Sequence, residues 1–162
     1  MPEPAEISLL DRVKIQADVL VPLVRALEAE LGRAAAHRIV GDALSEHFRV
    51  QARAHWDAVD HDLPVFMREW SARSDTEKAL TTTFLRVDDE HIDFDVTDCQ
   101  YARFWHELGA PDIGFLLQCS ADFAVDGAVD PLHLTRTQTR MQGASHCDFR
   151  FTIDPTTAEE ST

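Results

Sequence analysis

The residues best suited to covalent chemistry lie in the second half of the chain, between Cys119 and Phe151. Cys119 stands three residues before Asp122, and Cys147 stands directly before Asp148. On a helix, positions three apart share a face, so the Asp122 carboxylate could accept the Cys119 proton. A thiol is a good nucleophile because some of it is ionised near neutral pH. This pattern predicts nucleophilic catalysis, with Cys119, Asp122 and Cys147 as the candidate catalytic residues.

Polar side chains that could bind a substrate follow in the same stretch. A strand expected over 132–141 would alternate hydroxyl side chains on one face with longer polar side chains on the other. A threonine row can also reflect strand propensity alone, and an acid beside an arginine can be a sheet ion pair. An arginine fork is suited to a carboxylate. The candidate substrate-binding residues are Thr137, Thr139, Arg136, Asp148 and Arg150.

His146 precedes Cys147, so a regular strand would point the two side chains to opposite faces. A Cys–His catalytic pair would therefore require a bulge. A metal-activated water is the alternative mechanism, because thiolate, imidazole and carboxylate all bind zinc or iron. Its ligands would be Cys119, Asp122, His146 and Cys147. We predict no cofactor, while zinc and iron stay open.

The first half of the chain, which must help to position these residues, is predicted to be helical. Apolar residues at steps of three and four predict helices over 7–31, 34–56 and 63–73. Pro22 lies inside the first pattern and predicts a kink or break near Leu20. The first two helices should form an antiparallel pair because their connection is short.

The second half favours strands mixed with short helices. β-branched and alternating patterns predict strands over 81–87 and 91–96, joined by a turn at 88–90. Helices should follow over 100–108 and from Asp112 to about residue 124. Cys99 lies at the strand-to-helix junction, where it could be reactive or simply a small buried side chain.

These elements predict an α+β fold, in which a helical N-terminal half packs on a small antiparallel sheet formed by the C-terminal half. The length of 162 residues favours one domain, over 1–154, with a flexible acidic tail at 155–162.

Composition narrows the range of partners. The 29 acidic and 15 basic side chains give a formal net charge of −14, which disfavours nucleic acid and anionic membranes. We find no leader-like N-terminus and no run of 18 apolar residues, and the three cysteines lack paired spacing. We therefore expect a cytoplasmic protein that binds a small-molecule substrate. A homo-oligomer stays open.

Several short motifs together resemble the L-2-amino-thiazoline-4-carboxylic acid hydrolase family. They are Glu107-Leu108-Gly109 before Pro111, Cys119-x-x-Asp122, Arg136-Thr137-x-Thr139, Gly143 and Cys147-Asp148-Phe149-Arg150. Ala17, Pro22 and Glu30-Leu31-Gly32 extend the likeness into the first half. One departure is His146, where a second cysteine beside Cys147 is often expected.

The resemblance implies a hydrolase that opens a small ring. The name-giving activity adds water at the C=N carbon of a five-membered thiazoline ring and produces an N-carbamoyl amino acid. By analogy the substrate would contain a cyclic amidine, imide or lactam-like C–N bond. The resemblance carries roles over to Cys119, Asp122, Arg136, Thr137, Thr139, Cys147, Asp148 and Arg150.

Three functions stay open from the sequence: a cysteine hydrolase with Cys119 as the first candidate nucleophile, a metal-dependent ring hydrolase, and a small-molecule-binding module without catalysis. The chain contains no Gly-rich phosphate loop, no HExxH and no GxSxG motif. The commonest nucleotide-binding, zinc-protease and serine-hydrolase functions are therefore disfavoured.

Overall fold

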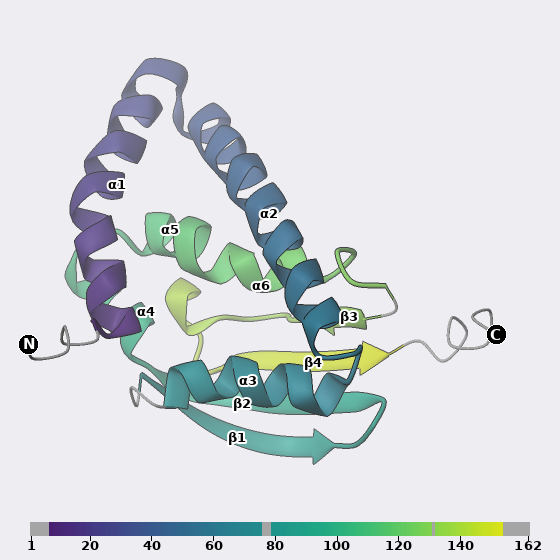
Figure 1. The fold of residues 1–162 in the computed structure, drawn as a ribbon. Coiled ribbons are helices and arrows are strands. Elements are labelled where there is room, and N and C mark those ends of the chain that lie inside the picture. The colour runs from purple at the N-terminus through teal and green to yellow at the C-terminus, as the bar shows by residue number, and fades with distance from the viewer. Residues whose placement is uncertain (1–6, 76–78, 131, 154–162) are drawn as a thin grey trace, which may run out of the picture.

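The computed structural model describes residues 7–75, 79–130 and 132–153, and only the backbone of 70–75. It confirms the predicted α+β class, with helices mostly in the first half and a four-stranded antiparallel sheet in the second (Figure 1). The predicted tail at 155–162 lies outside the described residues. The elements in order are α1 (Leu9–Leu31), α2 (Arg33–Ala58), α3 (Leu63–Asp75), β1 (Leu80–Val87), β2 (His91–Cys99), α4 (Gln100–Glu107), α5 (Pro111–Gly114), the π-helix η1 (Phe115–Cys119), α6 (Ser120–Val125), β3 (Leu132–Thr135), the 3₁₀-helix η2 (Arg140–Gln142) and β4 (Cys147–Ile153).

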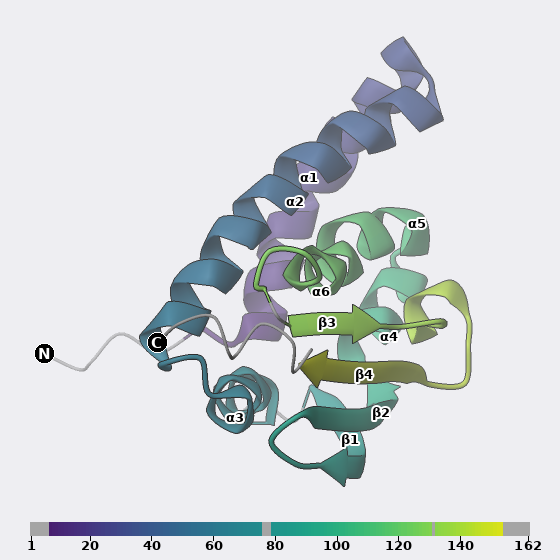
Figure 2. The ribbon, with the colours of Figure 1, turned by 90° about the vertical axis from the view of Figure 1, so that its right-hand side faces the viewer.

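The first two helices form a hairpin whose arms spread apart toward the sheet, with α1 reaching α4 and α2 reaching β3 (Figures 1 and 2). Gly32, at a φ of 80°, separates them. The sequence predicts a kink or a break near Leu20, and of these the break is wrong, because α1 runs without interruption from Leu9 to Leu31. Pro22 is exposed and removes only its own N–H bond, so water can satisfy the freed carbonyl on that side of the helix.

The sheet has the strand order β1-β2-β4-β3, and every neighbouring pair is antiparallel. The alternation in β2 buries Ile92, Phe94 and Val96, as predicted. The predicted 132–141 strand is too long, because β3 ends at Thr135 and η2 begins at Arg140. Beyond Thr135 the chain donates its N–H groups to the Asp148 side chain instead of to a backbone partner.

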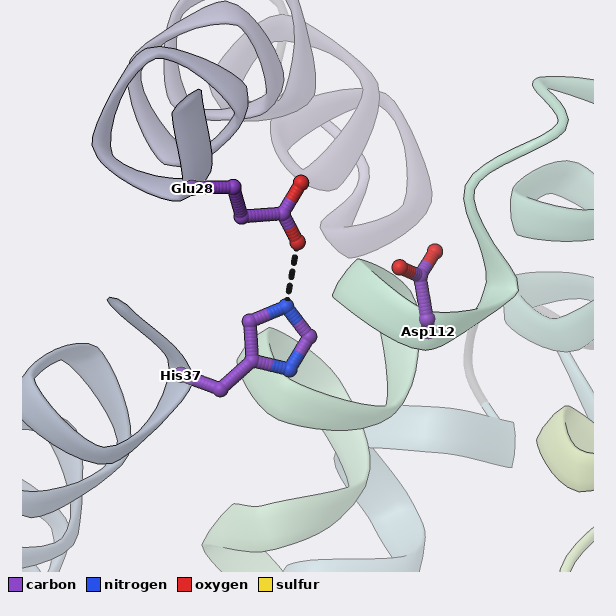
Figure 3. Close-up of side chains that lie close together, drawn as sticks. All are labelled: Glu28, His37 and Asp112. Atoms are coloured by element: carbon purple, nitrogen blue, oxygen red, sulfur yellow. Dashed lines mark hydrogen bonds and ion pairs between the residues drawn. The ribbon is translucent and has the colours of Figure 1, made fainter. Parts of the chain in front are cut away.

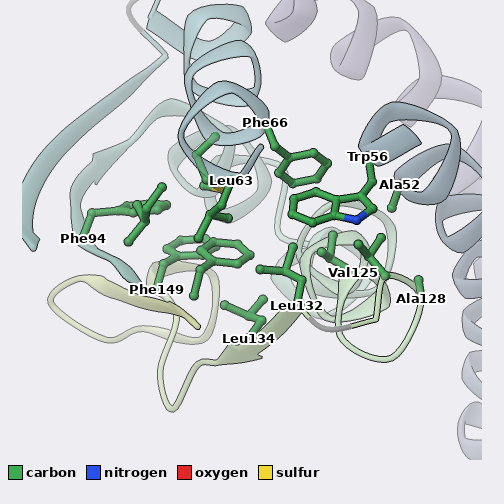
Figure 4. Close-up of a cluster of buried hydrophobic side chains, with 14 of the residues drawn as sticks. Ala52, Trp56, Leu63, Phe66, Phe94, Val125, Ala128, Leu132, Leu134 and Phe149 are labelled. Carbon is green, nitrogen blue, oxygen red and sulfur yellow. The ribbon is translucent and has the colours of Figure 1, made fainter. Parts of the chain in front are cut away.

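Two clusters of buried apolar side chains hold the fold together. The larger joins α2, α3 and α6 to the inner face of the sheet, where Trp56, Phe66 and Phe149 lie among aliphatic side chains (Figure 4). The smaller lies under α1, around Trp105, Ile113 and Met141. Burial of this much apolar surface is the main stabilising contribution to such a fold.

The helical segment 111–125 contains a short π-helix in place of the continuous α-helix that the sequence predicts. Phe115–Cys119 forms the wider turn, and the Ser120 hydroxyl donates a hydrogen bond to the Leu116 carbonyl. Such turns add one residue and rotate the side chains that follow, and they are frequent at functional sites. This turn orients Gln118, Cys119 and Asp122 toward the interior, where all three line one cavity.

Gly114, just before this turn, should be intolerant of any side chain. A Cβ placed there would lie 2.4 Å from Cγ of the buried Trp105. Gly114→Ala should therefore lower the free energy of unfolding by about 2 kcal/mol, because overpacking outweighs the gain in helix propensity. Urea denaturation measures the change.

Gly41 in α2 provides the matched control, because a Cβ there would lie 3.2 Å from the end of the Leu116 side chain. Gly41→Ala should change stability by less than about 1 kcal/mol. Equal effects of the two substitutions would contradict the tight Trp105 contact.

Candidate functional site

A cavity of about 130 Å³ lies between the inner face of the sheet and the 111–125 segment. It is bounded partly by the larger apolar cluster, through Phe94 and Phe149, and partly by the smaller one, through Ala102 and Met141. Its full lining is Leu80, Thr82, Phe94, Val96, Cys99, Tyr101, Ala102, Gln118, Cys119, Asp122, Arg136, Met141, Cys147 and Phe149.

All three predicted catalytic residues reach this cavity. Cys119 and Asp122 come from the 111–125 segment, and Cys147 comes from the first position of β4. Val96 pairs with Cys147 across the β2–β4 ladder, and both side chains face inward. The structure therefore brings together residues that lie 28 positions apart in the sequence.

Asp122 and Arg136 form an ion pair at the cavity wall. Arg136 Nη1 donates to Asp122 Oδ2 at 2.5 Å, and the side chains are only 2% and 15% exposed for Arg136 and Asp122 respectively. The guanidinium also lies 4.2 Å from the centre of the Phe149 ring, a cation–π contact. Buried ion pairs of this kind seldom add stability, so their presence at a cavity indicates another role.

Burial raises the pKa of Asp122 to about 6, although the neighbouring Arg136 charge lowers it. Near neutral pH the carboxyl is therefore mostly ionised, but it can take up a proton within the physiological range. A group with such a pKa is suited to general acid–base catalysis.

The three thiols differ in their surroundings. Burial raises the pKa of Cys99 to about 11, and burial together with the Asp122 charge raises that of Cys119 further still. The Cys147 sulfur accepts the Arg140 backbone N–H at 3.2 Å, and the Arg136 guanidinium is a charge neighbour of both Cys147 and Cys119.

Most of the predicted substrate-binding residues lie outside the cavity lining. Thr137 is exposed and donates its hydroxyl to Asp148, while Thr139 is buried and caps η2 by accepting the Gln142 N–H. Arg150 donates to Asp95 and to the Phe94 carbonyl on the other face of the sheet. Of the five candidates only Arg136 lines the cavity. The others hold the chain around β3 and β4.

We expect Asp148 to stabilise the fold and not to bind substrate. It accepts the N–H groups of Thr137 and Gln138 at 3.0 and 2.8 Å. Burial opposes the charge, but these bonds prevail and lower the pKa of Asp148. Asp148→Asn should lower the free energy of unfolding by about 1–3 kcal/mol at neutral pH, because the donors lose a charged acceptor. Urea denaturation measures the loss.

The pH dependence provides a second readout for Asp148. Because its folded pKa lies below the ordinary 3.8, its contribution is present above pH 3.8 and is lost as the pH falls through the folded value. The difference in the free energy of unfolding between wild type and Asp148→Asn should therefore become smaller as the pH falls below 3.8. Asp89→Asn, in the exposed β1–β2 turn, should have an effect within about 0.5 kcal/mol. Equal effects of both substitutions would argue against this role.

His146 does not reach the cavity lining. Its ring contacts the Gln138 amide and lies 3.8 Å from Asp95, on the opposite face from Cys147. Among the described residues, the only His, Cys, Asp and Glu side chains whose ligand atoms converge within 4.8 Å in a group of three or more are Glu28, His37 and Asp112. The predicted ligand set of Cys119, Asp122, His146 and Cys147 does not gather in this way.

Glu28, His37 and Asp112 join α1, α2 and α5 (Figure 3). Arg25 donates to both carboxylates, at 2.8 Å to Glu28 and 3.0 Å to Asp112, and Arg33 reaches Asp112 at 2.9 Å. Two guanidinium groups thus already neutralise the cluster. It is best described as the contact that attaches the helical hairpin to α5.

Sequence reasoning did not assign Cys99 or Gln118 to the site. Cys99 lines the cavity from the end of β2, where its sulfur accepts the Ala102 N–H. Its place at a strand-to-helix junction was the only available signal. Gln118 and Asp122 also line a second cavity of about 330 Å³, on the side of α2 that carries Gln51 and His55. These two side chains therefore stand between the two cavities.

Comparison with known proteins identifies one family. A family model described as L-2-amino-thiazoline-4-carboxylic acid hydrolase matches residues 12–151. No curated protein matches the chain. Among solved structures, the crystal structure of the phenol-responsive sensory domain of the transcription activator PoxR with phenol is similar, with 15% sequence identity and a TM-score of 0.48. The match covers 83% of this chain and 72% of that one. No described helix has the length and apolar character needed to cross a membrane.

Proposed function

Because the chain belongs to the L-2-amino-thiazoline-4-carboxylic acid hydrolase family, we propose that it hydrolyses a small cyclic amidine, imide or lactam-like compound in the cavity of about 130 Å³. The observation that supports this most is the convergence of Cys119, Cys147 and the Asp122–Arg136 pair on that single cavity. Nucleophile, proton acceptor and cation are the groups that hydrolysis of such a ring requires.

The size of the cavity is suited to a single ring. An apolar cavity of roughly 150 Å³ holds one benzene molecule, so about 130 Å³ accommodates a five-membered ring. Phe94 and Phe149 stack at 4.7 Å on the sheet side and form a flat wall. A planar ring therefore fits this space better than an extended chain.

Cys147 is the thiol that the surroundings favour as the nucleophile. Its sulfur accepts the Arg140 N–H, whereas burial and the Asp122 charge raise the pKa of Cys119 even though the Arg136 charge lowers it. The sequence placed Cys119 first, so this choice reverses the expected order of the two. In the proposed arrangement Cys119 forms part of the wall beside the ring.

The proposed reaction has two steps. The Cys147 sulfur adds to the C=N carbon, its proton passes to Asp122 and then to the leaving ring atom, and the bond between that atom and the carbon breaks. Water next adds to the same carbon, the sulfur–carbon bond breaks, and the proton from water returns to the thiol. The sum is one substrate and one water converted to an opened product.

A turnover assay tests the proposal. The purified protein is incubated with 2-aminothiazoline-4-carboxylate and with cyclic amides and ureas of the same ring size, and products are followed by mass spectrometry. We expect at least one ring compound to gain the mass of one water at a rate proportional to enzyme. No turnover of any member of the series would contradict the proposal.

A binding module without catalysis is the second candidate, and the thiol surroundings favour it. Two of the three cavity thiols, Cys99 and Cys119, have raised pKa values because they are buried, so they stay uncharged near neutral pH. Ring compounds that bind with micromolar affinity and are recovered unchanged after long incubation would favour this function over hydrolysis.

A further inference from the structure

We propose, on the basis of the hydrolase function above, that the Asp122–Arg136 pair binds an uncharged ring group that carries both an N–H donor and an acceptor, and not a substrate carboxylate. Ring amides and ureas carry such a group, and so do ring amidines in their unprotonated form. The sequence suggested the opposite, that Arg136 would hold a carboxylate. The contacts and the charges of the pair lead to the new assignment.

Arg136 has a donor without a protein partner among the described residues. Its side chain is 2% exposed, Nη1 is bonded to Asp122, and the buried Nε finds no hydrogen-bond acceptor. A buried N–H without an acceptor is costly and rare in native proteins. Arg136 lines the cavity but Nε is covered by protein atoms, so a bound ligand supplies the missing acceptor when the side chains over Nε move aside.

Asp122 provides the complementary acceptor. Its Oδ2 accepts the bond from Arg136. A carboxylate oxygen has two lone pairs, so Oδ1 can accept an N–H from a ligand. The pair thus offers a donor and an acceptor at one wall of the cavity, which matches the edge of an amide, a urea or a neutral amidine.

The charges of the cavity disfavour an anion. Asp122 and Arg136 are the only charged residues among the described residues of the lining, and they already neutralise each other. A substrate carboxylate would leave a net negative charge in a buried space beside Asp122, and such uncompensated charge is strongly unfavourable. A neutral group adds none.

The orientation of Arg136 further restricts the contact. One face of its guanidinium lies against the Phe149 ring at 4.2 Å, so a ligand reaches its N–H groups along the edge. An edge-on, planar partner meets this requirement. Any charged substituent on the ring would then point away from the pair.

Isothermal titration with three five-membered-ring compounds tests the inference on the wild-type protein. The compounds are 2-imidazolidinone, which has donors and an acceptor, cyclopentanone, which has only an acceptor, and cyclopentanecarboxylate, which is an anion. We expect 2-imidazolidinone to bind about tenfold more tightly than either other compound. Tightest binding of cyclopentanecarboxylate, or equal binding of all three, would overturn the inference.

The variant Arg136→Lys retains the charge and removes Nε. It should bind 2-imidazolidinone about tenfold more weakly than wild type. Arg150→Lys is the matched control, because Arg150 is also paired with an aspartate but lies outside the cavity lining. It should leave binding unchanged. An equal loss in both folded variants would contradict the role of Arg136.

The binding inference and the hydrolase proposal can be contradicted independently of each other. The titrations need no reaction, so a protein that binds 2-imidazolidinone selectively but opens no ring would contradict only the hydrolase proposal. A protein that opens a ring yet binds cyclopentanecarboxylate most tightly would contradict only this inference.

Discussion

Replacing Cys147 by serine is expected to slow ring opening on the order of 10³-fold or more, because the proposed nucleophile is lost. The hydroxyl of serine is far less ionised than a thiol and lacks an adjacent histidine to activate it: His146 contacts Gln138 on the other face. Substrate binding should change little, since one atom is replaced in a cavity of about 130 Å³. Steady-state kinetics with separate kcat and KM measures both effects.

Cys119→Ser is the matched control, since both thiols are buried and line the same cavity. It should reduce kcat less than about tenfold, because this cysteine is proposed to stay protonated beside the ring. The reverse ranking of the two variants would identify Cys119 as the nucleophile, as the sequence first suggested. Full activity in both variants would contradict nucleophilic catalysis by either thiol.

Asp122→Asn is expected to reduce kcat by about 10²–10⁴-fold, the usual contribution of a general acid–base group. In the wild type the rate should rise as the pH increases through about 6, because below this pKa the carboxyl is protonated and cannot accept the thiol proton. The variant should lack this rise. The pH profile of kcat measures it.

The pH profile also separates catalysis from stability in this variant. Removing the Asp122 charge leaves Arg136 buried without a counter-ion, which is expected to cost about 3–5 kcal/mol. A merely structural role would lower the amount of folded enzyme at all pH values and leave the rise near pH 6 in place. Retention of that rise in folded Asp122→Asn would therefore contradict the catalytic role.

Local patterns predict the elements of this fold well where one face of each element is buried. The alternation at Ile92, Phe94 and Val96 predicts β2 and its inward face. Asp62 before the third helix is of a residue type that caps helices, and its side chain accepts the Val65 N–H at 2.8 Å. In such elements the residue pattern and the tertiary environment favour the same conformation.

Local sequence patterns are less reliable where tertiary contacts determine the backbone conformation. The threonines after Leu134 favour a longer strand, but Asp148 takes the N–H groups of Thr137 and Gln138 and the strand ends. The π-turn at 115–119 has no evident sequence signal, although it determines where Cys119 and Asp122 point. Pro22 has less effect than expected because its side of α1 is exposed.

In the candidate site, too, some residues could be predicted from the sequence and others depend on tertiary contacts. Cys119, Asp122 and Cys147 could be selected by residue type, and the cavity brings them together. Cys99 and Gln118 could not be assigned, because their proximity depends on how β2 and the 111–125 segment pack. Thr137 and Asp148 resembled binding residues because they are polar and regularly spaced, yet they bond to each other.

A crystal structure of the Cys147→Ser variant with bound 2-aminothiazoline-4-carboxylate tests the central claim most directly. We predict that the ring lies in the cavity between Phe149 and Cys119, with its C=N carbon next to the side chain at position 147 and an N–H on Asp122 Oδ1. Arg136 Nε should donate to a ring acceptor. A ring bound elsewhere, or an empty cavity at a substrate concentration that saturates the protein in solution, would contradict the account.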